Sequence, residues 1–125
     1  MSEIRVTTLK DTSGANSSTT EQIASGRAKA WVNFNGAGVV AIRANFNVNS
    51  ITDNALGDYT VNFSTALTDA NYSYCSGGQV NLGVRTINFH PSESHFNAGS
   101  LRLAAVLNND SGLFDAGALS LTIFR

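Results

Sequence analysis

Two carboxylates, Asp53 and Asp58, flank a short stretch that could form an ion-binding loop. A calcium loop of the EF-hand type needs oxygen ligands at alternate positions and a final bidentate Glu. Here two apolar residues occupy ligand positions and no Glu follows. The Asp-Asn pair instead suits an Asx turn, and Gly57 suits a positive φ. We therefore predict a hairpin that joins strands over 48–52 and 59–63, and no calcium site.

A second group of potential ligands lies in residues 90–95, where His90, Glu93 and His95 could hold zinc. Their spacing matches no standard zinc pattern, and Pro91 between them favours a surface loop. Three copies of the loop meeting on a trimer axis could still form a metal site, and this alternative stays open. For a single chain the prediction is no metal and no cofactor.

Catalytic chemistry has little support in the sequence. Cys75 is the one cysteine, which excludes an intrachain disulfide, and nothing places a base beside it as a nucleophile would require. We find no nucleophile elbow, phosphate-binding glycine loop or paired Glu. Few side chains ionise, so an acid–base pair is not expected. The sequence predicts a protein that is not an enzyme, and Cys75 is assigned to a strand face.

Composition narrows the classes of partner. The 125 residues suffice for one domain with a real core, and 42% of them are hydrophobic. Charged residues make up 14%, against roughly 25% in globular domains, so Asn, Ser, Thr and Gly must supply the polar surface. A net charge of -1 provides no excess of positive charge with which the protein could attract nucleic acid or an anionic membrane surface. No signal peptide and no membrane-spanning apolar run is visible.

From residue 28 onward, apolar and polar residues alternate with the period of a β-strand, and strands must therefore position the side chains discussed above. One long strand is expected over 40–48, with its apolar side chains facing the core. Further alternating segments are separated by Gly, Asn and Asp, which predicts an all-β fold, an antiparallel β-sandwich of jelly-roll type. A bulge is expected near Arg85, where the apolar face switches. The apolar residues of the long strand are Val40, Ile42, Ala44, Phe46 and Val48.

The first 27 residues differ from this pattern and are predicted to form a separate arm. A short strand is expected over 4–9 and a polar loop over 10–20. Ser18 and Glu21 have the spacing of a capping box, which predicts a helix through Arg27. So short a helix needs a neighbour to be stable. We therefore predict a subunit interface built from Ile4, Val6, Leu9, Ile23 and Trp31.

Trp31 has two alternative roles. By alternation it lies opposite Val32 and Phe34, so it points away from the core. One interpretation buries it under the arm or against another subunit. The alternative makes it a stacking platform for a sugar ring, because aromatic faces beside amides suit carbohydrate. The first interpretation is preferred here.

A group of segments is distinctive: AKAWVNFNG (28–36), VAIR (40–43), FNVNSITDN (46–54), GDYTVNF (57–63), EIRV (3–6) through TSG (12–14), QIASGR (22–27) and LTIFR (121–125). These segments resemble bacteriophage tail-fibre proteins, especially short fibre and virion proteins of phages that infect aquatic bacteria. The likeness is dense from 28 to 63, covers about half of the chain and loosens between 71 and 119. It implies a virion structural protein, usually a trimer, with an N-terminal attachment segment (1–27) and a C-terminal β knob (28–125).

The function expected from this resemblance is a tail-fibre or receptor-binding component of the virion. It would trimerise, attach to other virion proteins through the arm and bind a bacterial surface glycan. The alternatives are a capsid cement protein that decorates the head, or a small lectin-like module. Loops over 75–79, 90–99 and 108–117 are the expected contacts, with His95, Phe96, Asn97 and Phe114 facing the receptor. In the alternative reading, both Phe side chains anchor their loops on the core.

Overall fold

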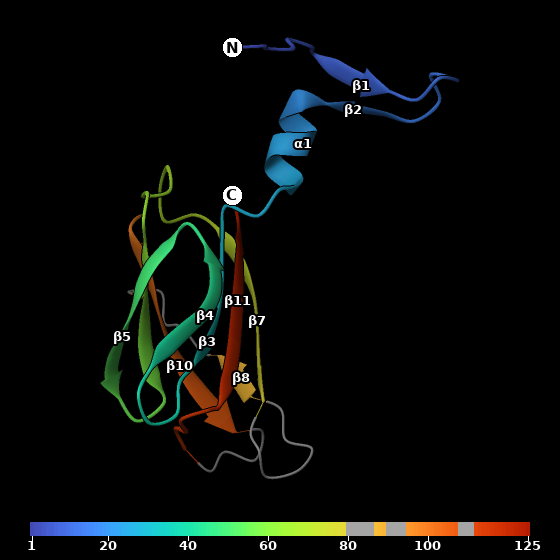
Figure 1. Cartoon of the computed structure of the whole chain (residues 1–125). Coiled ribbons are helices and arrows are strands. Elements are labelled where there is room, and N and C mark those ends of the chain that lie inside the picture. The colour runs from blue at the N-terminus through green and yellow to red at the C-terminus, as the bar shows by residue number, and fades with distance from the viewer. Residues whose placement is uncertain (80–86, 90–94, 108–111) are drawn as a thin grey trace.

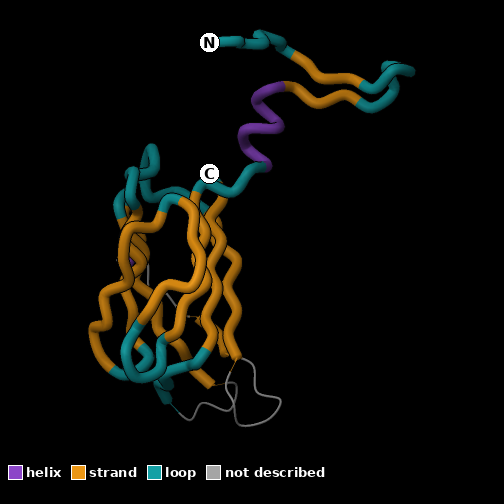
Figure 2. The backbone as a smooth tube through the Cα atoms, in the orientation of Figure 1, coloured by secondary structure: helices purple, strands orange, loops and turns teal. Residues whose placement is uncertain are grey.

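The computed structural model describes residues 1–79, 87–89, 95–107 and 112–125. Figure 1 shows an arm (residues 1–27) that projects from a larger β body (residues 28–125). The arm holds a small hairpin and a helix, and the body is built of strands (Figure 2). The elements of the arm are β1 (Thr8–Lys10), β2 (Ser17–Thr19) and α1 (Thr20–Gly26). The strands of the body are β3 (Ala30–Asn35), β4 (Ala41–Phe46), β5 (Val48–Ala55), β6 (Asp58–Phe63), β7 (Ser73–Gln79), β8 (Ile87–Phe89), β9 (Phe96–Asn97), β10 (Ser100–Leu107) and β11 (Ala118–Phe124).

Two antiparallel sheets form the β body. One has the order β5-β6-β10-β8, with β9 also paired to β10, and the other has the order β4-β3-β11-β7. Alternate side chains of both sheets meet in one apolar core, as the period-two pattern requires. The prediction of a mostly β, antiparallel fold is confirmed. The fully buried large side chains are Tyr59, Phe34, Leu101, Leu103, Leu119, Leu121, Ile123, Val32 and Val61.

The predicted long strand over 40–48 is wrong, because the chain forms two strands that belong to different sheets. Asn47 ends β4 in a left-handed conformation, with φ of 53°, and β5 begins at the next residue. Its side-chain amide donates to the carbonyls of Lys29 (3.0 Å) and Thr65 (3.1 Å) and accepts from the Thr65 amide (2.8 Å). Asn tolerates this conformation better than most residues and here fixes the corner between sheets.

A bulge within β4 explains a second difference. The pairing of β3 with β4 shifts between Asn33 and Phe34, so that Phe34 pairs with Ile42 but Asn33 pairs with Ala44. One extra residue in β4 moves every later side chain to the opposite face. Phe46, predicted to be buried, is therefore 53% exposed. The bulge predicted near Arg85 lies outside the described residues.

The arm follows the prediction in kind but not in detail. β1 and β2 pair as a hairpin, so residues 17–19 are a strand instead of loop. The helix exists, but Thr19, not Ser18, is its N-cap: Thr19 Oγ1 accepts from the Gln22 amide (3.1 Å), and the Gln22 side chain accepts from the Thr19 amide (2.9 Å). Ser18 is instead a residue of strand β2, where it pairs with Leu9 across the hairpin. Over the described ranges, no helix has the length and apolarity to cross a membrane.

Candidate functional site

The β5–β6 hairpin brings together the polar side chains from which the sequence analysis began. β5 ends at Ala55 and β6 starts at Asp58, so the turn consists of two residues, with Gly57 at a φ of 65°. The predicted hairpin is confirmed. The predicted Asx turn is wrong, because Asp53 and Asn54 belong to β5 and their side chains project from the strand.

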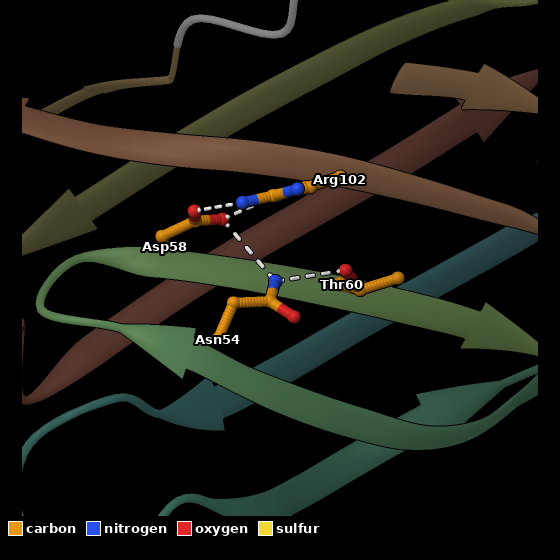
Figure 3. Close-up of polar contacts among 4 residues, drawn as sticks. All are labelled: Asn54, Asp58, Thr60 and Arg102. Atoms are coloured by element: carbon orange, nitrogen blue, oxygen red, sulfur yellow. Dashed lines mark hydrogen bonds and ion pairs between the residues drawn. The ribbon is translucent and has the colours of Figure 1, made fainter. Parts of the chain in front are cut away.

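Asp58 is the centre of a polar cluster on the outer face of this sheet (Figure 3). Arg102, on β10, donates from Nε (2.9 Å) and Nη2 (2.6 Å) to the two oxygens of Asp58. Asn54 donates from Nδ2 to Asp58 (3.2 Å) and to the Thr60 hydroxyl (2.9 Å). The Arg102 hydrogen bonds hold the pKa of the Asp58 carboxyl below its usual range. A carboxylate kept ionised by a guanidinium serves as an anchor and is a weak proton donor or acceptor near neutral pH.

Amides and hydroxyls continue along the same face. Asn62, two residues beyond Thr60, donates to the hydroxyls of Ser50 (3.2 Å) and Thr52 (2.9 Å) across the strand pair. These bonds are cross-strand contacts of the kind that stabilise sheets. The outer face of β5-β6-β10 is therefore a pre-ordered polar surface, whose groups already satisfy one another.

A buried polar junction lies between this hairpin and the opposite sheet. The Tyr59 hydroxyl is 2.7 Å from Asp115 Oδ1 and 2.8 Å from the Gly36 carbonyl, and the Gly57 amide donates to the same Asp115 oxygen (2.7 Å). Burial, with a smaller contribution from Asp115, raises the pKa of Tyr59 far above its usual value. Tyr59 therefore stays protonated and ties the β3–β4 turn to the segment before β11. These hydrogen bonds therefore have a structural role: they hold the segments together.

The predicted receptor-facing residues lie near opposite ends of β10. Phe96 in β9 packs on the core, with its ring 5.3 Å from that of Tyr72 and 6.0 Å from that of Tyr74. Phe96 pairs with Leu101 near the start of β10. Asn97 beside it is exposed and His95 is half-buried.

Phe114 lies at the other end of β10. Its amide donates to the Ala105 carbonyl (3.0 Å), and its ring packs against the core. Ala105 is four residues beyond Leu101, which places Phe114 about 13 Å along the strand from Phe96. Both Phe side chains thus follow the alternative reading, in which they anchor their segments to the core.

Other parts of the predicted loops fall elsewhere. Residues 75–79 are not a loop but most of strand β7, where they pair with β11. His90 and Glu93 lie outside the described residues, as do 108–111, so the axial metal site remains a hypothesis. In the described ranges, no group of three His, Cys, Asp or Glu side chains comes together as metal ligands would.

The predicted interface residues of the arm are all accessible. Ile4 is 86% exposed and Leu9 54%, while Val6 and Ile23 are each 43% exposed. No residue of α1 is buried. An open hollow of about 620 Å³ separates the hairpin from the helix, with Leu9 and Ile23 among its lining. A second hollow, of about 300 Å³, lies in the β body and is lined in part by Lys29, Leu67 and Arg125.

Trp31 is 38% exposed on the outer face of β3, as alternation predicted. The residue that sequence reasoning missed is Phe46, which pairs directly with Trp31 across β3 and β4. Local alternation contained no signal for it, because the bulge that turns it outward is a property of the strand pairing. The two aromatic side chains form an exposed pair.

Comparisons with protein-family models, with curated proteins and with solved structures find no match to this chain.

Proposed function

We propose that this protein is a structural and attachment component of a bacteriophage virion. It assembles as a homotrimer through its arm, joins other virion proteins there, and presents its β body to a bacterial surface glycan. The β body is, in this proposal, a β-sandwich of jelly-roll type, which is compatible with two antiparallel sheets around one core. The sequence resemblance to tail-fibre proteins supplies the virion role.

One observation carries the proposal: every large apolar side chain of the arm is exposed, so the arm has no core of its own, whereas the body has a buried apolar core. Four large apolar side chains of the arm are between 43% and 86% exposed, whereas the core residues of the body are at most 8% exposed. A seven-residue helix with nothing buried is marginal in water, and the exposed Leu9 and Ile23, which line the same hollow, offer apolar surface for another protein to cover. The arm is thus suited to attachment.

The low share of charged residues supports the same proposal. Only 14% of residues are charged, so the β body offers mainly amides and hydroxyls to its surroundings. Such groups hydrogen-bond to sugar hydroxyls as well as to neighbouring protein copies. The ion pairs Arg102–Asp58 and Arg125–Asp69 neutralise charge locally.

The test is to locate the protein in virions purified from its source culture. We expect mass spectrometry to detect the chain in the particles and immunogold labelling to place it on the tail. A chain that lacks residues 1–26 should be absent from the particles. Labelling confined to the capsid would support the cement role instead, and absence of the intact chain from purified particles would contradict any virion role.

A further inference from the structure

The outer face of the sheet β4-β3-β11-β7 has a composition that the proposed attachment role does not by itself explain. Cross-strand pairing sets side chains in rows, and one row runs from Phe46 through Trp31 and Thr122 to Cys75. The next row contains Asn33 and Ser120, with only Ala44 and Gly77 at its ends. We call these two rows the neutral face.

The neutral face carries no charged side chain across four strands. Two cations that adjoin these strands in sequence donate to backbone carbonyls: Lys29 to that of Ala24 in the arm, and Arg43, the bulge residue, to that of Gly117. Solvent-exposed sheet faces ordinarily include charged residues, since these make up roughly 25% of a globular domain. An uncharged surface is complementary to an uncharged partner.

Its aromatic end is open to solvent. Trp31 is 38% and Phe46 53% exposed, whereas Val32 and Phe34, on the inward face of β3, are at most 1% exposed. Directly opposed residues on paired strands lie about 5 Å apart at Cβ, so the Trp31 and Phe46 side chains stand next to each other, and we call this apolar pair the platform. Leaving this area in water is unfavourable, which indicates that a partner covers it.

Hydrogen-bonding groups lie beside this platform. Asn33 Nδ2 donates to the Ser120 hydroxyl (2.9 Å), which fixes the orientation of the amide. That bond uses one of the two amide donors, and the amide oxygen also accepts. The Thr122 hydroxyl is next to Trp31 in the first row. With strands about 4.8 Å apart, the row spans about 14 Å, enough for a short oligosaccharide.

We propose that the neutral face binds an uncharged polysaccharide, whose sugar rings stack on Trp31 and Phe46 and whose hydroxyls bond Asn33, Ser120 and Thr122. This inference rests on the proposed attachment to a surface glycan. It moves the contact from the loops to a rigid sheet and specifies the class of glycan. Sugars present an apolar C–H face and polar edges, and this pairing of rings with amides and hydroxyls matches both.

The chain contains two built-in reporters of this face. Trp31 is the single tryptophan and Cys75 the single cysteine, and both lie in the first row. The experiment titrates the full-length protein with dextran, mannan and galactan, and with the anionic polysaccharide alginate. We expect at least one neutral polysaccharide to shift Trp31 emission in a saturable way and to slow alkylation of the exposed Cys75. Alginate should do neither.

Variants complete the test by native affinity electrophoresis. Phe46→Ala should weaken retardation by the responding polysaccharide roughly tenfold, the loss expected for one stacked ring, and Trp31→Ala should abolish it. Val39→Ala is the matched control, because Val39 is 87% exposed and apolar but lies outside the neutral face. It should be retarded like the wild type. Melting temperatures should be nearly equal for all three variants.

Three outcomes would overturn the inference. If a polysaccharide retards the protein while both aromatic variants bind normally, the neutral face is not the site, yet glycan attachment itself stands. If Trp31 emission shifts with protein concentration alone, a second copy covers the face. If no polysaccharide in the panel retards the protein, glycan binding fails together with this inference, although arm-dependent incorporation into virions remains a separate result.

Discussion

At the scale of residues, the carboxylate of Asp58 stabilises the β5–β6 hairpin through its bonds to Arg102. Its pKa is depressed in the folded protein, so its contribution is present above the unfolded pKa of about 3.9 and is lost as pH falls through the lower folded value. We predict that Asp58→Asn lowers the melting temperature by roughly 1–3 °C at pH 7 and by less below pH 4. Calorimetry across this pH range measures the effect.

Asp53→Asn is the matched control for that variant, because it removes the same charge from an exposed position of the paired strand. It should change the melting temperature less at pH 7. Addition of EDTA to the wild type should leave the melting temperature unchanged. A large drop with EDTA would restore a metal site at this hairpin.

Tyr59 offers a second prediction at this scale. Its one hydroxyl proton can be donated to either Asp115 or the Gly36 carbonyl, and both oxygens lie within 2.8 Å. Tyr59→Phe leaves buried acceptors without this donor, so we expect a loss of about 1–3 kcal/mol in the free energy of unfolding. Urea denaturation gives the value. Among the described residues, the Tyr72 hydroxyl contacts two backbone carbonyls (3.0 and 3.2 Å) and no carboxylate, so Tyr72→Phe should cost less.

At the scale of elements, the corner at Asn47 decides where one sheet ends and the other begins. Asn47→Ala and Asn47→Gly both remove the same three side-chain hydrogen bonds. Only Gly adopts a φ of 53° without a steric cost, so Asn47→Ala should be less stable than Asn47→Gly by about 1 kcal/mol. Equal unfolding free energies for the two variants would show that the corner relaxes to another conformation.

At the scale of the whole molecule, the proposed trimer predicts a definite mass in solution. Light scattering of the full chain at micromolar concentration should give three times the monomer mass of 13.2 kDa. Removal of residues 1–26 should shift the mass to that of a monomer while the β body keeps its melting transition, because the core residues all lie at or beyond Ala30. A monomeric full-length chain would contradict the proposed trimer.

The sequence alone determined the class of fold and much of its local detail. Period-two alternation predicted the inward Val32 and Phe34 and the outward Trp31, and Gly57 marked a tight hairpin turn. The capping-box spacing of Ser18 and Glu21 predicted a helix near residue 20, and the observed N-cap, Thr19, is one residue away from the predicted one. These features follow from each residue and its immediate neighbours, so a linear pattern records them.

Only the tertiary structure decided which distant side chains meet and which face each strand presents. Arg102 and Asp58 are 44 residues apart and Tyr59 and Asp115 are 56 apart, and no spacing rule links them. The outward position of Phe46 depends on a bulge that exists only when β4 is paired with β3. Alternation assigns sides of one strand, whereas register and bulges arise from cross-strand hydrogen bonding. The neutral face therefore became visible only in the folded sheet.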